Sequence, residues 1–217
     1  MKAVMLSEHL RASYPATKSS MSLRRLVKGV GVNDADYITT VYGNDWRIEC
    51  PAKASWMSMM NRCYGRSYLD KFGSYRGVSV CEEWLSFMSF RDWWVQNYVD
   101  GWHLDKDLLS PDRVYSPKTC VYVPQWLNNF LTDHRSARGD CPVGVTKQKN
   151  RFKAVCSNPL TKKNEYIGLF ANATDAHSAW VDKKIEHANS LRQVMDSIDC
   201  RIYPRVIDHI KTRLAAE

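Results

Sequence analysis

Residues 103–130, HLDKDLLSPDRVYSPKTCVYVPQWLNNF, contain the pattern on which the fold of this chain depends. Alternating apolar and polar residues predict a short strand that carries Asp105 and Asp107, and the Ser-Pro-Asp sequence after it predicts a turn. The residues from Cys120 to Val123 favour a second strand, and a helix is expected after Pro124. We therefore expect strand, strand and helix in that order.

In such a unit Asp105 would end the first strand and face Asn128 on the helix. Mg²⁺ takes few protein oxygens and keeps several waters, so one carboxylate and one amide oxygen would be enough to hold it. We expect a Mg²⁺ or Mn²⁺ site on Asp105 and Asn128. The alternative is that these two residues, together with Asp107, are ordinary polar residues of a surface turn and a helix.

Three parts of this segment resemble the HNH, or ββα-metal, nucleases, in particular their phage-borne branch. They are Leu104-Asp105-Lys106, the segment from Tyr115 to Cys120, and the segment from Pro124 to Asn129. With the sequences around Trp56 and Trp84, which also resemble this branch, the likeness spans roughly residues 31 to 190. It implies a hydrolase, a divalent-metal-dependent endonuclease that nicks or cleaves DNA and is similar to homing endonucleases.

The resemblance also assigns roles to individual residues. Asp105 and Asn128 match the metal ligands, whereas Lys106 stands where the general-base histidine is usual and Thr119 where the asparagine that orients it is usual. A protonated lysine cannot take a proton from water, but its charge can stabilise a phosphate. His103 is two residues before Asp105, on the same strand face, and is the alternative base. The expected catalytic residues are His103, Asp105, Lys106 and Asn128.

A polar segment that contains Gly, residues 133–141, is interpreted as a linker. The sequence after it predicts two strands joined at Lys149, a third strand from Asn164, and a helix capped by Asn172. Three strands followed by an Ala-rich helix resemble the Apetala-type (ethylene-response-factor) DNA-binding fold. That resemblance implies that the sheet enters the major groove of double-stranded DNA.

The charge distribution independently favours a nucleic-acid partner. The net charge is +8, and an excess of Lys and Arg attracts polyanions through counterion release. Between residues 133 and 163, eight Lys or Arg stand against two acids. Arg151 and Lys153 share one strand face by the period of two, a pattern that a solvated edge also gives. The expected DNA-binding residues are Arg135, Arg138, Lys147, Lys149, Arg151 and Lys153.

Composition limits the class of protein. The 217 residues, 44% hydrophobic and 25% charged, suit a globular chain with two small domains. No apolar run approaches the roughly 18 residues of a membrane helix, and the start of the chain has no secretory pattern. We expect a soluble intracellular protein without a membrane partner, located in the host cytoplasm if it is phage-encoded. Oligomeric state is not predicted.

The seven cysteines are scattered without close pairs, so we expect reduced thiols and no disulfide framework. Cys63, Cys81 and Cys120 fall in the nuclease-like region, but a structural zinc site needs four ligands and the fourth is absent from the sequence pattern. Buried free thiols are therefore expected in place of zinc. A helix from Cys81 should carry an aromatic stripe, Trp84, Phe87, Phe90 and Trp94, that belongs to the core.

The expected fold class is α+β, with a ββα-metal (HNH-like) module followed by a three-stranded antiparallel sheet plus helix. The expected function is a phage HNH-family endonuclease. The alternatives are a catalytically degenerate DNA-binding regulatory or accessory phage protein, or a protein that binds and inhibits a host enzyme. The expected division is a basic, mobile N-terminal arm that contacts DNA (1–36), the HNH-like module (37–132), the linker (133–141), the Apetala-type domain (142–191) and a helical tail (192–217).

Overall fold

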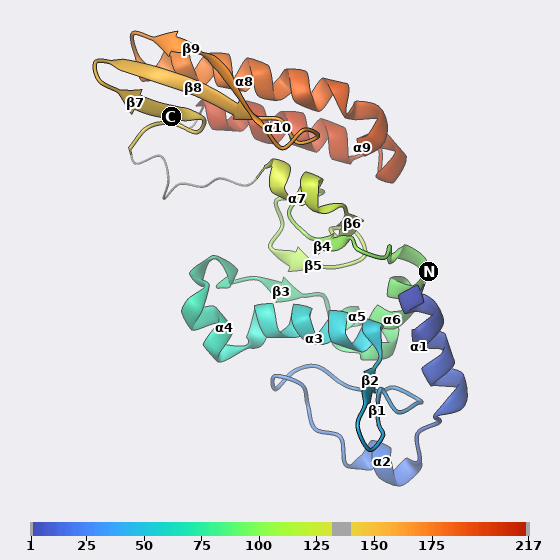
Figure 1. Ribbon diagram of the computed structural model, residues 1–217. Coiled ribbons are helices and arrows are strands. Elements are labelled where there is room, and N and C mark those ends of the chain that lie inside the picture. The colour runs from blue at the N-terminus through green and yellow to red at the C-terminus, as the bar shows by residue number, and fades with distance from the viewer. Residues whose placement is uncertain (1, 132–139, 216–217) are drawn as a thin grey trace. The chain divides into compact units, whose positions relative to one another are not determined.

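The computed structural model describes residues 2–131 and 140–215. It confirms an α+β class in which helices alternate with small sheets. The chain divides into two compact units, Met1–Tyr122 and Val123–Glu217, shown in Figure 1. The boundary therefore falls inside the segment that was expected to form the strand, strand and helix module.

The first unit holds short strands between helices. Its elements are α1 (Lys2–Ser13), α2 (Lys18–Ser22), β1 (Thr40–Tyr42), β2 (Arg47–Glu49), α3 (Pro51–Tyr64), α4 (Arg66–Lys71), η1 (Gly73–Tyr75), β3 (Ser79–Val80), α5 (Glu82–Leu85), α6 (Phe87–Asn97), β4 (His103–Asp105), β5 (Val114–Tyr115) and β6 (Val121–Val123), whose last residue begins the second unit. Strands β1 and β2 pair antiparallel and form a hairpin. Strand β5 pairs parallel with β3, and β4 pairs with β6.

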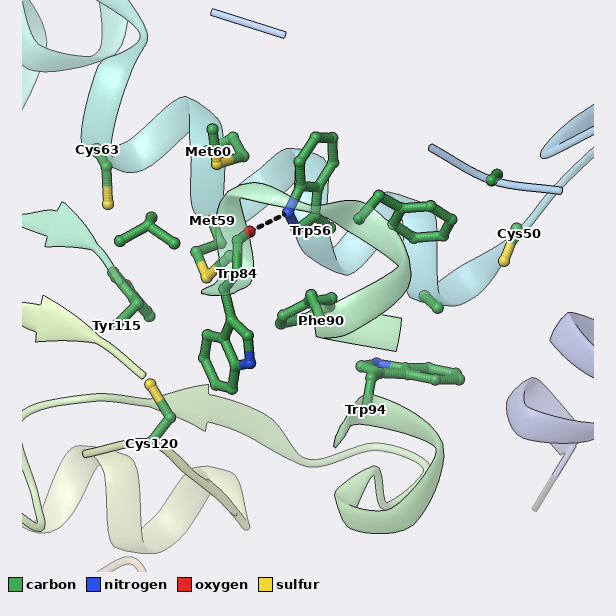
Figure 2. Close-up of a cluster of buried hydrophobic side chains, with 14 of the residues drawn as sticks. Cys50, Trp56, Met59, Met60, Cys63, Trp84, Phe90, Trp94, Tyr115 and Cys120 are labelled. Atoms are coloured by element: carbon green, nitrogen blue, oxygen red, sulfur yellow. Dashed lines mark hydrogen bonds between the residues drawn. The ribbon is translucent and has the colours of Figure 1, made fainter. Parts of the chain in front are cut away.

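The core of the first unit is built from aromatic side chains of α3, α5 and α6. The aromatic stripe predicted from Cys81 onward is completely buried, as are Trp56, Met59 and Met60 on α3. Figure 2 shows a hydrogen bond between α3 and α5, in which Trp56 Nε1 donates to the carbonyl of Trp84 at 2.8 Å. The stripe is core, as expected, and it fixes α6 against α3.

The single helix expected from Cys81 is interrupted at Ser86. Its Oγ accepts a hydrogen bond from Ser89 N at 3.1 Å, which caps α6. The same hydroxyl donates to Asp34 at 2.6 Å, and Asp34 also accepts from Met88 N at 2.9 Å. A distant carboxylate therefore favours a new helix start here over continuation of α5.

The first residues of the chain pack on this core as α1, where we expected an arm. Leu10 and Ser7 are buried, and the buried guanidinium of Arg91 donates to Ser7 Oγ at 3.2 Å and to Glu8 at 2.8 Å. At the other end, the N–H groups of the first turn donate to the carboxylate of Asp100. An acid is favourable at a helix N-terminus, so the middle and the N-terminal end of α1 are both held to the rest of the first unit.

The second unit contains α7 (Gln125–Phe130), β7 (Val145–Gln148), β8 (Arg151–Ser157), β9 (Asn164–Phe170), α8 (Ala173–Ser190), α9 (Arg192–Ile198) and α10 (Ile202–Ala215). The three strands form an antiparallel sheet in chain order, with a bulge between Ala154 and Val155. Asn172 caps α8 by accepting from Asp175 N at 2.8 Å, as predicted. These strands and this helix confirm the order of elements expected for residues 142–191.

One face of the sheet is covered by α8. Val145 and Ala154 are paired across β7 and β8 and are buried against Ala176 of α8. Helix α10 packs on α8 and buries Ile202, Val206 and Ile210, which recur every fourth residue. Figure 1 shows α10 alongside α8, and these buried residues place this part of the expected C-terminal tail in the core of the second unit.

Candidate nucleic-acid interface and the predicted metal site

The uncovered face of the β7–β8–β9 sheet follows from the strand register. Since Val145 and Ala154 face α8, their neighbours Thr146 and Lys153, which pair with each other, face away from it. The next outward pair is Gln148 and Arg151. Arg151 and Lys153 therefore share one face of β8, as the period of two predicted.

Strand β9 adds an aromatic and an aliphatic side chain to this outer face. Leu169 pairs with Lys153, and beyond the bulge Tyr166 pairs with Val155. Tyr166 is 61% exposed and Leu169 39% exposed, and Lys153 Nζ lies 5.9 Å from the centroid of the Tyr166 ring. The outward side of β9 therefore adds exposed apolar area beside the cations of β8.

No acidic side chain stands among the outward positions of the three strands. We call this set the outer sheet face: Thr146, Gln148, Arg151, Lys153, Val155, Ser157, Asn164, Tyr166 and Leu169. Its formal charge is therefore positive, and it combines guanidinium, ammonium, amide, hydroxyl and aromatic groups. Sequence reasoning missed Gln148, Tyr166 and Leu169, although the period of two along β7 and β9 could have placed them.

The other predicted DNA-binding residues lie elsewhere. Lys149 is exposed at the turn between β7 and β8, where it has a left-handed φ of 52°. Lys147 pairs with Phe152 and so points to the opposite side of the sheet from Lys153, although it too is exposed. Arg135 and Arg138 lie outside the described residues.

Asp105 ends β4 and closes a turn with its own side chain. Oδ1 accepts hydrogen bonds from Asp107 N at 2.9 Å and from Leu108 N at 2.7 Å, a local pattern typical of Asp in turns. Burial raises the pKa of this carboxyl above its ordinary value. The two amide hydrogen bonds lower the pKa, but their effect is smaller than that of burial. His103, on the same face of β4, is exposed.

Lys106 is buried beside two aromatic rings. Its Nζ lies 5.8 Å from the ring centroids of both Tyr75 and Tyr115, and it forms an ion pair with Asp107. The cation therefore has packing partners, and its side chain borders a small pocket of about 370 Å³ that Arg113 also lines. This is an environment for a structural lysine whose charge is balanced by Asp107.

Thr119 stabilises the turn between β5 and β6. Its hydroxyl donates to the Val114 carbonyl at 2.6 Å and accepts from Ser116 N at 3.1 Å. The side chain is buried and engaged locally. Together with Lys106, it occupies a position where the nuclease resemblance would place catalytic machinery, and here both residues have structural partners.

The predicted metal ligands belong to different units, Asp105 to the first and Asn128, on α7, to the second. The donor chemistry of one carboxylate and one amide oxygen suits Mg²⁺. Within residues 2–131 and 140–215, however, no three or more His, Cys, Asp or Glu side chains are grouped so that they could hold a metal ion. The Asp105 and Asn128 site stays a prediction.

A buried polar chain links α8 to the sheet. Cys156 Sγ lies 3.7 Å from His187 Nδ1, and His187 Nε2 lies 3.1 Å from the Glu165 carboxylate, which also accepts from Asn158 Nδ2 at 2.7 Å. The arrangement has the order of a thiol, an imidazole and a carboxylate. Burial nevertheless excludes the Cys156 thiol from solvent and raises its pKa, which favours the unreactive protonated form. The chain is a structural connection.

The seven cysteines are all free, and Cys63 and Cys120 are buried in the first unit. In the part of the chain that the structure describes, no helix has both the length and the apolar character needed to cross a bilayer. No protein-family model, no curated protein and no solved structure matches the chain significantly.

Proposed function

We propose that this protein binds double-stranded DNA through the outer sheet face and that residues 142–191 form an Apetala-type DNA-binding domain. One observation carries the proposal: Arg151, Lys153, Gln148 and Tyr166 lie together on a sheet face that has no acidic side chain. The order of three strands and a covering helix is a further support.

The dimensions of the sheet suit a DNA groove. Neighbouring strands lie about 4.8 Å apart, so three strands span roughly 10 Å. The major groove is about 12 Å wide and admits strands as well as a helix. A sheet of this width can therefore present its outer side chains to base edges.

The side chains of the outer face have the chemistry that base recognition needs. Arginine makes paired hydrogen bonds to guanine, and glutamine does so to adenine. Arg151 and Gln148 are directly opposite each other on neighbouring strands, so they are suited to contact adjacent base pairs. Lys153 and the hairpin residue Lys149 supply charge for phosphates, which fix the register of a protein on the duplex.

Fluorescence anisotropy of the full chain with labelled duplex DNA tests this function. Affinity should fall steeply with salt, with a log–log slope of about −0.9 for each phosphate that the protein neutralises. A parallel titration with polyglutamate controls for simple attraction to a polyanion. Absence of binding, or affinity that does not change with salt, would exclude the proposal.

The second candidate function is divalent-metal-dependent cleavage of the bound DNA, as in HNH nucleases. The supporting observation is that His103 and Asp105 share one face of β4, which pairs with β6 directly before α7. Asp105 and Asn128 would hold Mg²⁺ or Mn²⁺, which would stabilise charge on a phosphate, and His103 would accept the proton of the attacking water. The structural partners of Lys106 and Thr119 instead favour binding without cleavage.

Supercoiled plasmid incubated with the protein and Mg²⁺ or Mn²⁺ distinguishes the two candidates. Conversion to the relaxed or linear form that EDTA prevents would support the endonuclease. Binding of the plasmid without conversion would leave a DNA-binding regulatory or accessory protein.

A further inference from the structure

A pocket in the second unit lies among α7, the connection between β8 and β9, and α8. Its volume is about 500 Å³, within the range of about 300–1,000 Å³ typical of small-ligand sites. Its lining includes aromatic, amide and basic side chains: Gln125, Trp126, Asn129, Phe130, Lys162 and Lys184. None of the outward residues that support base recognition, Gln148, Arg151, Lys153 or Tyr166, is among its lining residues.

Two lysines are among the residues that line the pocket. Lys184 is only 7% exposed, and its Nζ lies 3.8 Å from the centroid of the Phe130 ring. Lys162 contributes a second ammonium group from the loop after β8. Among the described residues that line the pocket, none is Asp or Glu.

The loop that carries Lys162 is held in a defined conformation. Asn158 Oδ1 accepts from the N–H groups of Leu160 and Thr161, and the Asn158 carbonyl accepts from Lys162 N at 2.9 Å. Lys162 has a left-handed φ of 58°, which is uncommon for a residue with a side chain and costs about 1 kcal/mol or more. Strain of this kind is often kept where it positions a functional side chain.

The remaining lining residues can recognise an aromatic ring with polar edges. Trp126 is partly exposed on α7 and offers an indole face, and Gln125 and Asn129, also on α7, are exposed amides. Bases stack on aromatic side chains irrespective of sequence, and amide groups pair with base edges. We propose that this pocket binds one nucleotide, with its base against Trp126 and its phosphate at Lys162.

The nucleotide has two possible sources with the same chemistry, a free mononucleotide or an unpaired nucleotide of a DNA strand. Enzymes and strand-binding proteins take single bases into such pockets when the base is unstacked. Only binding of a strand nucleotide rests on the proposed DNA-binding function, because a free nucleotide needs no contact between the protein and a duplex. The proposal also requires no cleavage.

Isothermal titration of the full-length protein with dAMP, dTMP and a short single-stranded oligonucleotide tests the pocket. Trp126→Ala should weaken binding roughly 5- to 150-fold, the effect of losing one base–aromatic stack. Lys162→Asn should weaken binding and reduce its salt dependence, because asparagine tolerates the left-handed backbone but has no charge. Lys163→Asn is the matched control, since Lys163 is the next residue and is exposed outside the pocket lining.

Binding of both ligand types with competition between them would assign a free nucleotide, and binding of the oligonucleotide alone would assign a strand nucleotide. Either result, with the expected variant effects, supports the proposal. Absence of binding up to millimolar ligand, or wild-type binding by both Trp126→Ala and Lys162→Asn, would overturn it. The double variant Arg151→Ala, Lys153→Ala should keep nucleotide binding while its duplex affinity falls, so failure of the pocket and failure of the outer sheet face are distinguishable.

Discussion

The Asp105 carboxylate is bonded to the backbone of Leu108, whose N–H donates to Oδ1 at 2.7 Å. A second bond from Asp107 N at 2.9 Å completes the turn, which ends β4 and leads the chain to buried Leu108 and Leu109. Burial raises the pKa of the carboxyl, so its charge is not what the turn requires. Asparagine offers the same acceptor oxygen without the charge. The variant Asp105→Asn should therefore keep the turn while it removes the charge that a metal ion would need.

Asp105→Ala should lower the free energy of unfolding by about 1–3 kcal/mol, because two backbone N–H groups lose their acceptor. Asp105→Asn should leave stability at neutral pH nearly unchanged. Urea unfolding at pH 7 measures both. If Asp105 also holds a metal ion, Asp105→Asn abolishes plasmid nicking although the protein is folded. Nicking by Asp105→Asn at the wild-type rate would exclude Asp105 as a ligand.

If the protein cleaves DNA, His103→Ala should slow nicking by about 10²- to 10⁴-fold, the usual effect of removing a positioned base. Lys106→Met should have a smaller effect, because the Lys106 ammonium packs on Tyr75 and Tyr115 and pairs with Asp107. Single-turnover nicking with excess enzyme separates these effects from DNA affinity. A larger loss from Lys106→Met than from His103→Ala would contradict the assignment of His103 as base.

The stability of the second unit should decrease in acid through Glu165. Hydrogen bonds from Asn158, His187 and Lys183 hold the pKa of Glu165 below its ordinary value. A carboxyl with a lowered folded-state pKa stabilises the fold above its unfolded pKa of about 4.3, and this contribution disappears as the pH falls through the folded-state value. Melting temperatures at pH 7 and in acid test this.

Glu165→Gln is the comparison for that experiment. It should melt lower than the wild type at pH 7, and the difference should shrink as the pH falls below about 4. A difference that is the same at every pH would mean that the ionisation of Glu165 does not stabilise the unit.

Gly144→Ala should destabilise the sheet of the second unit. Gly144 has a φ of 78°, and a Cβ there would lie 2.0 Å from Trp180 Cδ1, so the substitution combines backbone strain with a clash against a buried ring. We expect a loss of about 2 kcal/mol or more. Amide hydrogen exchange of β7–β9 measures it within this unit. Gly73→Ala, where a Cβ would meet no atom within 4 Å, is the control and should have little effect on exchange in the first unit.

The elements of the second unit could be predicted because their signals are local. Alternation along β8, the turn at Lys149 and the Asn172 cap are each contained within a few residues. The break at Ser86 could not be predicted, since it depends on Asp34, 52 residues away in the chain. The packing of α1 depends in the same way on Arg91, which bonds to residues 83 and 84 positions earlier.

The candidate sites also combine features that local sequence predicts with features that only the fold creates. The shared face of Arg151 and Lys153 follows from the strand period, whereas the burial of Lys106 and Lys184 depends on rings that the fold brings to them. Tyr75 and Tyr115 lie beside Lys106, and Phe130 lies beside Lys184. A lysine is ordinarily a surface residue, so its sequence pattern gives no sign of such an environment.

Binding of DNA by the outer sheet face is tested by the duplex affinity of the double variant Arg151→Ala, Lys153→Ala. The matched control is Arg192→Ala, Lys211→Ala, which removes the same charge from exposed positions on α9 and α10.

Anisotropy titrations of both double variants across a range of salt concentrations give the affinity and the salt slope together. The double variant Arg151→Ala, Lys153→Ala should bind duplex DNA at least about tenfold more weakly than the control variant does. Removing a side chain that hydrogen-bonds to a base costs about 1–3 kcal/mol. The salt slope of the Arg151→Ala, Lys153→Ala variant should also be shallower by about 0.9 for each phosphate that the variant no longer neutralises. If both double variants lose the same duplex affinity, the outer sheet face is not the DNA-binding surface. Affinity would then depend on the total charge of the second unit.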